Sequence, residues 1–201
     1  MDFFLITDII GLIAFSISGF LIAVEYKLDL LGTLISVFST ALLGGIIRDT
    51  IAGNTPFAFT HIYPSAVVIT IFVITYVTNI YKKHDIEHHK SFVFVDAIGL
   101  ASFSITGALV GINEGLNLFG VIFLSSITAI GGGMFRDMLL NAKPVFLDRG
   151  FYMSVAFVIS IIVVTLNYFS YINDLSLICV FAFGLMLRMI AYTRKWGLPR
   201  L

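Results

Sequence analysis

Seven long apolar stretches constrain the fold of this chain more than any other feature. A helix of about 20 apolar residues crosses the hydrocarbon core of a bilayer, whereas an open sheet cannot satisfy its backbone there. Hydrophobic residues make up 59% of the chain and charged residues only 12%, which is typical of a membrane protein. The sequence therefore predicts an all-α membrane protein with seven transmembrane helices. The predicted spans are Phe3–Val24, Leu30–Ile47, Ile62–Tyr81, Phe92–Ile112, Leu116–Phe135, Gly150–Phe169 and Leu175–Thr193.

The basic residues predict the orientation of these helices. With the N-terminus outside, nine lysines and arginines fall in cytoplasmic segments and none in external segments, while Arg48, Arg136 and Arg188 belong to spans or their ends. Because cytoplasmic loops are enriched in Lys and Arg, we expect an external N-terminus and a cytoplasmic C-terminus. In a prokaryotic cell the membrane would be the plasma (inner) membrane. Aromatic residues near span ends, including Tyr63 and Tyr152, are typical of interfacial anchors.

An internal repeat with an offset of 88 residues divides the chain into two halves. Residues 8–56 align with residues 96–144 without a gap, and 19 of the 49 positions are identical. Each repeat contains three predicted helices, so the second copy enters the membrane from the opposite side. Such inverted repeats often place a substrate or ion path at their interface, although an ancient duplication without a path would leave the same pattern.

The repeat also predicts the domain organisation. We expect a first three-helix repeat over 1–81, a cytoplasmic connector over 82–91, an inverted second repeat over 92–169, and a seventh helix with a cytoplasmic tail over 170–201. The connector is rich in lysine and histidine. Its lysines suit anionic lipid headgroups, and we interpret its histidines as part of a charged loop, so no metal site is predicted.

Glycine clusters followed by an Arg-Asp pair occupy matching places in spans two and five. Consecutive glycines destabilise a helix interior by about 1 kcal/mol each relative to alanine, so we expect the three glycines of span five to kink or unwind it, whereas the two glycines of span two also fit close packing. Freed carbonyl groups in a wet cavity could coordinate a cation, while close packing of helices by small residues is the alternative. The motif residues are Gly44, Gly45, Arg48 and Asp49 in the first repeat and Gly131, Gly132, Gly133, Arg136 and Asp137 in the second.

Two charged sites are predicted, one near each mouth of a central path. Span one starts outside and span two ends outside, so Asp8 and Arg48 share one side of the membrane. By the repeat, Asp96 and Arg136 share the other side. Charged residues within spans usually face the interior of a bundle or a water-filled cavity. The alternative is that both arginines snorkel to the headgroups.

Hydroxyl side chains recur in the middle of spans in both repeats. Ser16 and Ser104 occupy equivalent positions in spans one and four, and Thr40 and Thr128 do so in spans two and five. Such hydroxyls either line a pore or donate to carbonyl groups of their own helix. The repeated placement leaves both interpretations open.

Several classes of function lack support in the sequence. The formal net charge is zero, which gives no reason to expect a nucleic acid partner. The sequence contains no nucleotide-binding loop, no zincin motif and no arrangement of a nucleophile beside a base. We therefore predict neither enzymatic activity nor a cofactor.

The duplicated Gly-Gly-x-x-Arg-Asp motif at 44–49 and 132–137, in two three-helix repeats with a seventh helix, resembles the prokaryotic branch of the trimeric intracellular cation (TRIC) channels. The resemblance covers nearly the whole chain. It implies a homotrimer with a pore inside each protomer that conducts monovalent cations, chiefly potassium with modest selectivity over sodium. It also implies that the glycine clusters kink the pore-lining helices and that the motif's arginines and aspartates line or support the pore.

Three functions are compatible with these features. The leading hypothesis is a potassium-permeable channel in which carbonyls and hydroxyls coordinate the ion. The second is a secondary transporter of a small zwitterion such as glycine, since many transporters contain inverted repeats and broken helices, and relatives of this branch have been labelled possible glycine transporters. The third is a structural membrane protein, which would support no flux and would tolerate polar substitutions at Ser16 and Ser104.

Overall fold

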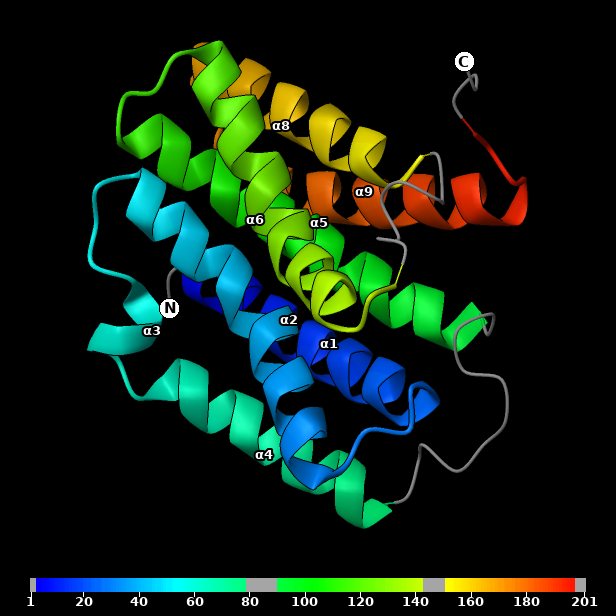
Figure 1. Cartoon of the computed structure of the whole chain (residues 1–201). Helices are drawn as coiled ribbons and strands as arrows, with labels where there is room; N and C mark the ends of the chain where they lie inside the picture. Colours follow the sequence, from blue (N-terminus) through cyan, green and yellow to red (C-terminus); the bar gives the residue numbers. More distant parts are fainter. Residues whose placement is uncertain (1–2, 79–89, 143–150, 198–201) are drawn as a thin grey trace.

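The computed structural model describes residues 3–78, 90–142 and 151–197, and within these ranges the chain forms eight α-helices and no strand (Figure 1). The helices are α1 (Phe3–Glu25), α2 (Leu30–Ile51), α3 (Phe57–Thr60), α4 (Tyr63–Thr78), α5 (Lys90–Asn113), α6 (Leu118–Leu139), α8 (Tyr152–Tyr168) and α9 (Asp174–Thr193). Most of the predicted connector, residues 82–89, is outside the described residues.

The predicted all-helical membrane fold is confirmed. Five described helices, α1, α2, α5, α6 and α9, are long and apolar enough to cross a bilayer, and α4 and α8 are shorter apolar helices. Each predicted span overlaps one of these seven helices. The largest difference is at the ends of α2 and α6, which continue four residues past the predicted Ile47 and Phe135. The Arg-Asp pairs therefore belong to the last turns of these helices.

Equivalent capping residues explain why α2 and α6 begin where they do. The side chain of Asp29 accepts a hydrogen bond from the amide of Gly32 at 2.7 Å, and Asn117 accepts one from Gly120 at 2.9 Å. Asp and Asn are preferred at this position because they satisfy an amide that has no partner within the helix. Both caps are in the aligned segments, so the repeat reproduces the start of its second helix.

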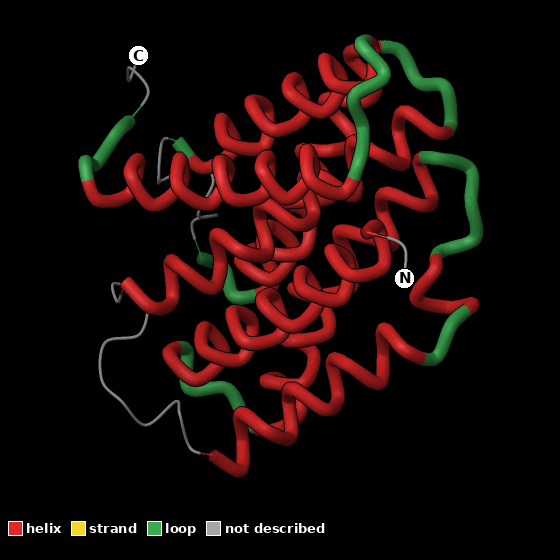
Figure 2. The backbone as a smooth tube through the Cα atoms, turned by 180° about the vertical axis from the view of Figure 1, so that it is seen from behind, coloured by secondary structure: helices red, strands yellow, loops and turns green. Residues whose placement is uncertain are grey.

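The helices pack in a pattern that is repeated in the two halves. The helix α1 packs against α2 and α4, and α5 packs correspondingly against α6 and α8; the two halves meet through the contacts of α1 with α5 and of α2 with α6. The extra helix α9 packs against α5 and α8. Figure 2 shows the same bundle from behind. This arrangement places the two Arg-Asp helices, α2 and α6, side by side.

Two phenylalanines meet where α1 crosses α5. The rings of Phe15 and Phe103 pack edge to face, with centroids 5.2 Å apart at 81°, a favourable arrangement for aromatic pairs. Each ring also lies where a side chain would otherwise project from the opposite helix, Phe103 against Gly11 and Phe15 against Gly99. The repeated glycines Gly11 and Gly99 therefore allow α1 and α5 to pack closely, because a Cβ at either position would overlap a buried ring.

Candidate functional site

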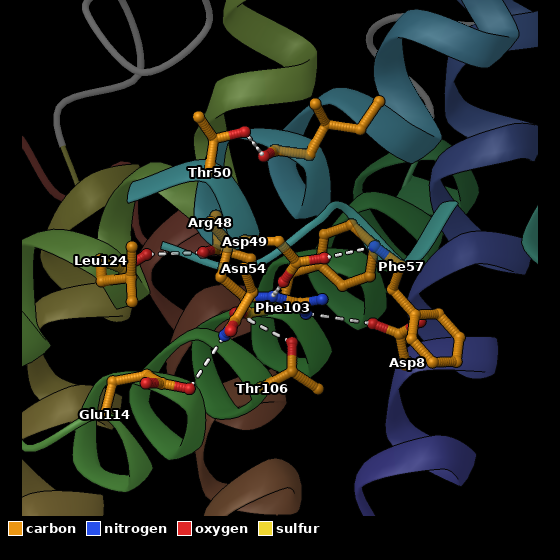
Figure 3. Close-up of polar contacts among 12 residues, drawn as sticks. Asp8, Arg48, Asp49, Thr50, Asn54, Phe57, Phe103, Thr106, Glu114 and Leu124 are labelled. Atoms are coloured by element: carbon orange, nitrogen blue, oxygen red, sulfur yellow. Dashed lines mark hydrogen bonds and ion pairs between the residues drawn. The ribbon is translucent and has the colours of Figure 1, made fainter. Parts of the chain in front are cut away.

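A buried charged cluster joins α1 to the end of α2. The Nε of Arg48 lies 2.7 Å from Oδ1 of Asp49, and its Nη1 lies 3.3 Å from Oδ1 of Asp8 (Figure 3). All three residues are buried, with 3–6% of their surface exposed. Arg48 thus holds two carboxylates with one planar guanidinium, a geometry that lysine cannot reproduce. The predicted spatial pairing of Asp8 with Arg48 is present, and snorkelling of Arg48 to the headgroups is not.

Two further donors complete this first cluster. The backbone amide of Phe57, the first residue of α3, donates to Oδ2 of Asp49 at 2.8 Å. The hydroxyl of Tyr63, the first residue of α4, donates to Oδ2 of Asp8 at 3.4 Å. Each carboxylate is therefore shared between Arg48 and a group from the third helical region of the repeat. A narrow cavity borders the cluster, lined by Asp8, Arg48 and Asp49 together with apolar residues that include Leu42, Phe57, Ala58 and Phe103.

The second cluster, at the end of α6, has the same residues but different contacts. The Nε and Nη2 of Arg136 donate to Oδ1 of Asp137 at 2.9 and 2.7 Å. Asp96 shares a narrow cavity with both residues and with Tyr152, and its Oδ1 accepts a hydrogen bond from Ser18 of α1 at 3.2 Å. The Nη1 of Arg136 is buried and has no hydrogen-bond partner in the described structure. Asp96 and Arg136 therefore line one cavity, as the repeat predicts, but the described residues show no ion pair between them.

The extra helix contributes a charge to this second cluster. The guanidinium of Arg188 in α9 lies over the ring of Tyr152, 4.6 Å from its centroid. Arg188 is buried, with 2% of its surface exposed. The first cluster has a different cation–π contact, in which Arg48 lies 5.3 Å from the ring centroid of Phe4. The two ends of the molecule are thus related by the repeat but are not electrostatically identical.

The glycine clusters pack α2 against α6. Both helices are uninterrupted through their glycines, so the predicted unwound segment is wrong. A Cβ at Gly44 would overlap the backbone carbonyl of Thr128, and a Cβ at Gly132 would overlap the carbonyl of Thr40. This reciprocal contact explains the result, because close approach of two helix backbones requires small residues and the surrounding helix retains its own hydrogen bonds.

The other motif glycines are less constrained. The nearest atoms to a Cβ at Gly45 and at Gly133 would be the Nη2 atoms of Arg48 and Arg136, at 3.8 and 3.7 Å. At Gly131 the nearest would be a methyl group of Ile47, at 3.4 Å. These are ordinary van der Waals distances. Only one glycine of each cluster is therefore required for the helix contact.

The mid-span hydroxyls do not line either cavity. Ser16, Ser104, Thr40 and Thr128 are almost completely buried, and each donates to the carbonyl four residues earlier in its own helix at 2.6 to 2.7 Å. Their interpretation as pore-lining groups is not supported by this structure. Hydroxyl donation back to the helix satisfies the buried oxygen without any partner from another helix.

Different hydroxyls connect the helices. Ser36 of α2 donates to the carbonyl of Gly19 at 2.9 Å, and Ser125 of α6 donates to the carbonyl of Ser104 at 2.7 Å. We expect Ser36→Ala and Ser125→Ala each to lower the free energy of unfolding by about 1 kcal/mol, the usual contribution of a hydrogen bond. Ser16→Ala and Ser104→Ala are matched controls and should change it by less. Thermal unfolding in detergent measures the difference, and equal losses in all four variants would contradict this assignment.

Two functional candidates are not evident from the sequence. Their positions near span ends predict that Tyr63 and Tyr152 are interfacial anchors, whereas the structure places them in the two charged clusters. Each begins the third apolar helix of its repeat, but the two are 89 residues apart instead of 88. The second repeat has one more residue between Pro144 and Tyr152 than the first has between Pro56 and Tyr63, so an alignment with a one-residue gap after Pro56 pairs the two tyrosines. Among the described residues, no group of three or more His, Cys, Asp or Glu side chains is arranged to hold a metal ion.

The duplicated helices and their buried Arg-Asp clusters define a helical membrane protein of the internal-repeat class. One family model, described as glycine transporter, matches this chain twice, over residues 5–79 and 93–168. Relatives include the UPF0126 membrane protein YvgT of Bacillus subtilis, 32% identical over 96% of this chain and 93% of that protein. The UPF0126 inner membrane protein YadS of Escherichia coli K12 is 30% identical over 80% of this chain and 77% of that protein. The chain belongs to this UPF0126 family.

Solved structures of TRIC channels share the fold. One, from work on the structural basis for conductance through TRIC cation channels, is 36% identical, with a TM-score of 0.87 over 98% of this chain and 96% of that one. A second, the TRIC trimeric intracellular cation channel orthologue from Rhodobacter sphaeroides, is 26% identical, with a TM-score of 0.88 over 98% of this chain and 100% of that one. The resemblance to prokaryotic TRIC proteins is confirmed, and the double match of one family model agrees with the internal repeat.

Proposed function

We propose that this protein is a potassium-permeable, monovalent cation channel with a pathway inside each protomer, between the two repeats. The observation that carries the proposal is the near-complete structural similarity to TRIC cation channels, combined with a charged cavity at the end of each Arg-Asp helix. Buried acidic side chains beside cavities suit cations. The pathway would connect the cavity at Asp8 with the cavity at Asp96.

The contact between α2 and α6 would control this pathway. In the present structure Gly44 and Gly132 pack against backbone carbonyls of the opposite helix, which leaves no room for an ion between them. Conduction then requires α2 and α6 to separate. Separation would expose the carbonyls of Thr40 and Thr128, and carbonyl oxygens can replace part of the hydration shell of a cation.

The proposal includes an arrangement in the membrane. Seven helices would span the bilayer as two inverted three-helix repeats and a seventh helix, with the N-terminus outside and the C-terminus in the cytoplasm, as the basic residues predict. The Escherichia coli relative is named an inner membrane protein, which supports the inner membrane of a prokaryotic cell. The Rhodobacter structure is of a trimeric channel, which supports a homotrimer surrounded by membrane lipids.

A transporter of a small zwitterion such as glycine is the second candidate. The description of the matching family model favours it. Each cavity has an arginine and aspartates, whose charges are complementary to a carboxylate and an ammonium group. Glycine is larger than a dehydrated potassium ion, so this function would require a wider opening of the same cavities.

Ion flux from liposomes distinguishes the two candidates. Purified protein would be reconstituted in liposomes loaded with potassium chloride, and efflux would be driven by a potassium gradient. We expect rapid flux that needs no organic solute and that falls at least about tenfold in Asp137→Asn, since tenfold corresponds to only about 1.4 kcal/mol. The exposed Lys195→Gln is the control and should leave the flux unchanged. Absence of potassium flux, together with saturable, gradient-driven uptake of glycine, would favour the transporter.

A further inference from the structure

The short helix α3 lies at the first cavity and is tied to both of its carboxylates. Phe57 and Ala58 of α3 are among the residues that line this cavity. The Phe57 amide donates to Asp49 and, at the other side of α3, the Tyr63 hydroxyl donates to Asp8. Figure 3 shows Phe57 beside Asp49, and Asp8 beyond the Arg48 guanidinium. The acceptors on Asp8 and Asp49 are Oδ2 atoms, whereas Arg48 uses Oδ1 of each.

Few other contacts hold α3 in place. None of its four residues is buried, and it packs chiefly against α2 and α4. Segments with few buried apolar contacts open locally at small free energy. The preceding turn contains Gly53 with φ of +78°, and Asn54 there is fixed by a 2.8 Å hydrogen bond from its Nδ2 to Glu114. The chain is thus anchored before α3 at Asn54 and again in α4 after Tyr63, where Pro64 and Val68 are buried, with residues 56–63 between.

The aromatic side chains make α3 and its flanking residues one unit. The ring of Phe57 stacks on His61, with centroids 3.7 Å apart at 14°, and lies 5.1 Å from the ring of Tyr63. His61 is exposed, so this stack is at the surface side of the cavity. Because the rings pack together, loss of the hydrogen bond to Asp8 should weaken the hydrogen bond to Asp49, and the reverse should also hold.

We propose that residues 56–63, the α3 strap, are a gate that closes the first cavity and is latched by Asp8 and Asp49. Release of the strap opens the cavity on that side and frees one oxygen of each carboxylate for a monovalent cation. The passage of an ion through this gate rests on the proposed channel function, whereas the opening of the first cavity on release of the strap does not depend on it. The equivalent segment of the second repeat lies mostly within residues 143–150, outside the described structure, so the proposal concerns the first cavity alone.

The chemical accessibility of a thiol in the cavity tests the strap. Leu42 lines the cavity and is buried, so Leu42→Cys places a thiol there without adding volume. The exposed native Cys179 would be replaced by serine. The rate of reaction with a small cationic thiol reagent then reports opening of the cavity in reconstituted protein.

Two variants each remove one of the hydrogen bonds that hold the strap. Tyr63→Phe deletes only the hydroxyl that donates to Asp8. Phe57→Pro deletes the amide donor, and proline fits the first position of a helix after Pro56, whose ψ of 128° suits a residue that precedes proline. Phe57→Ala is the matched control, because it also removes the ring but keeps the amide. We expect the reaction to accelerate about fivefold or more in Tyr63→Phe, and about fivefold in Phe57→Pro relative to Phe57→Ala, the effect of roughly one hydrogen bond.

A second cysteine separates opening from misfolding. Val163 of α8 is completely buried, so Val163→Cys should remain unreactive wherever the fold is intact. If Phe57→Pro makes the thiol of Val163→Cys reactive, that variant has misfolded and the test rests on Tyr63→Phe, which removes only one oxygen atom. If Tyr63→Phe leaves the reaction rate of the Leu42→Cys thiol unchanged, the proposed gate is wrong, even if the protein conducts potassium. Accelerated rates without any potassium flux would support the opening and contradict its role in an ion channel.

Discussion

Gly132→Ala should destabilise the protein strongly, whereas Gly133→Ala, one residue later, should not. The added methyl group at Gly132 would overlap the backbone carbonyls of Thr40 and Ser39. Backbone cannot yield as a flexible side chain does, so α2 and α6 must move apart. We expect a loss of about 3 kcal/mol or more in the free energy of unfolding, at the upper end for overpacked cores.

The neighbouring glycines provide matched controls within the same helix turns. A Cβ at Gly133 would be no closer than 3.7 Å to Arg136, and one at Gly45 no closer than 3.8 Å to Arg48. Alanine there should be neutral or should stabilise the helix by up to about 1 kcal/mol. Gly44→Ala should behave like Gly132→Ala, because the contact is reciprocal. Equal effects at Gly132 and Gly133, measured by thermal unfolding in detergent, would favour a role in helix bending over close packing.

Arg48→Met should be the most damaging substitution in the first charged cluster. It leaves the carboxylates of Asp8 and Asp49 buried together without their shared cation. Breaking a buried ion pair by removing one partner typically costs about 3–5 kcal/mol, and two adjacent carboxylates should place this variant at the upper end. Arg48→Lys should recover only part of the loss, because one ammonium cannot reproduce both the Nε and Nη1 contacts.

A double-mutant cycle tests whether Asp8 and Arg48 act together. Asp8→Asn removes one of the two carboxylates, so the pair Asp8→Asn with Arg48→Met should be more stable than the sum of the single losses implies. We expect a coupling of about 1–3 kcal/mol, the range for residues in one buried network. Strictly additive losses would show that the 3.3 Å contact between these side chains contributes no specific interaction.

The sequence predicted the helices well for a physical reason. The thickness of a bilayer sets the length of an apolar run, so composition alone located the helices to within a few residues. The topology then predicted that Asp8 lies near Arg48, because span one begins and span two ends on the same side of the membrane, and the repeat extended this prediction to Asp96 and Arg136. Neither inference required knowledge of side-chain packing.

What the sequence did not predict depends on contacts between helices. The helix α3 has only four residues, Phe57–Thr60, which are too few to produce a periodic pattern. The role of Gly132 could not be separated from that of Gly133, because only the approach of Thr40 distinguishes them. The sequence does not decide between a pore and a helix carbonyl for the hydroxyls of Ser16 and Ser104, because only the side-chain conformation shows that both donate to carbonyls of their own helix.

Single-channel recording in a planar bilayer tests the central proposal most directly. The purified protein would be studied with a potassium chloride gradient between two chambers. The proposed channel should produce unitary currents whose reversal potential lies close to the potassium equilibrium potential, and Asp137→Asn should reduce these currents whereas Lys195→Gln should not. Reversal at the chloride equilibrium potential, or silent membranes that contain correctly folded protein, would contradict a cation pathway through this fold.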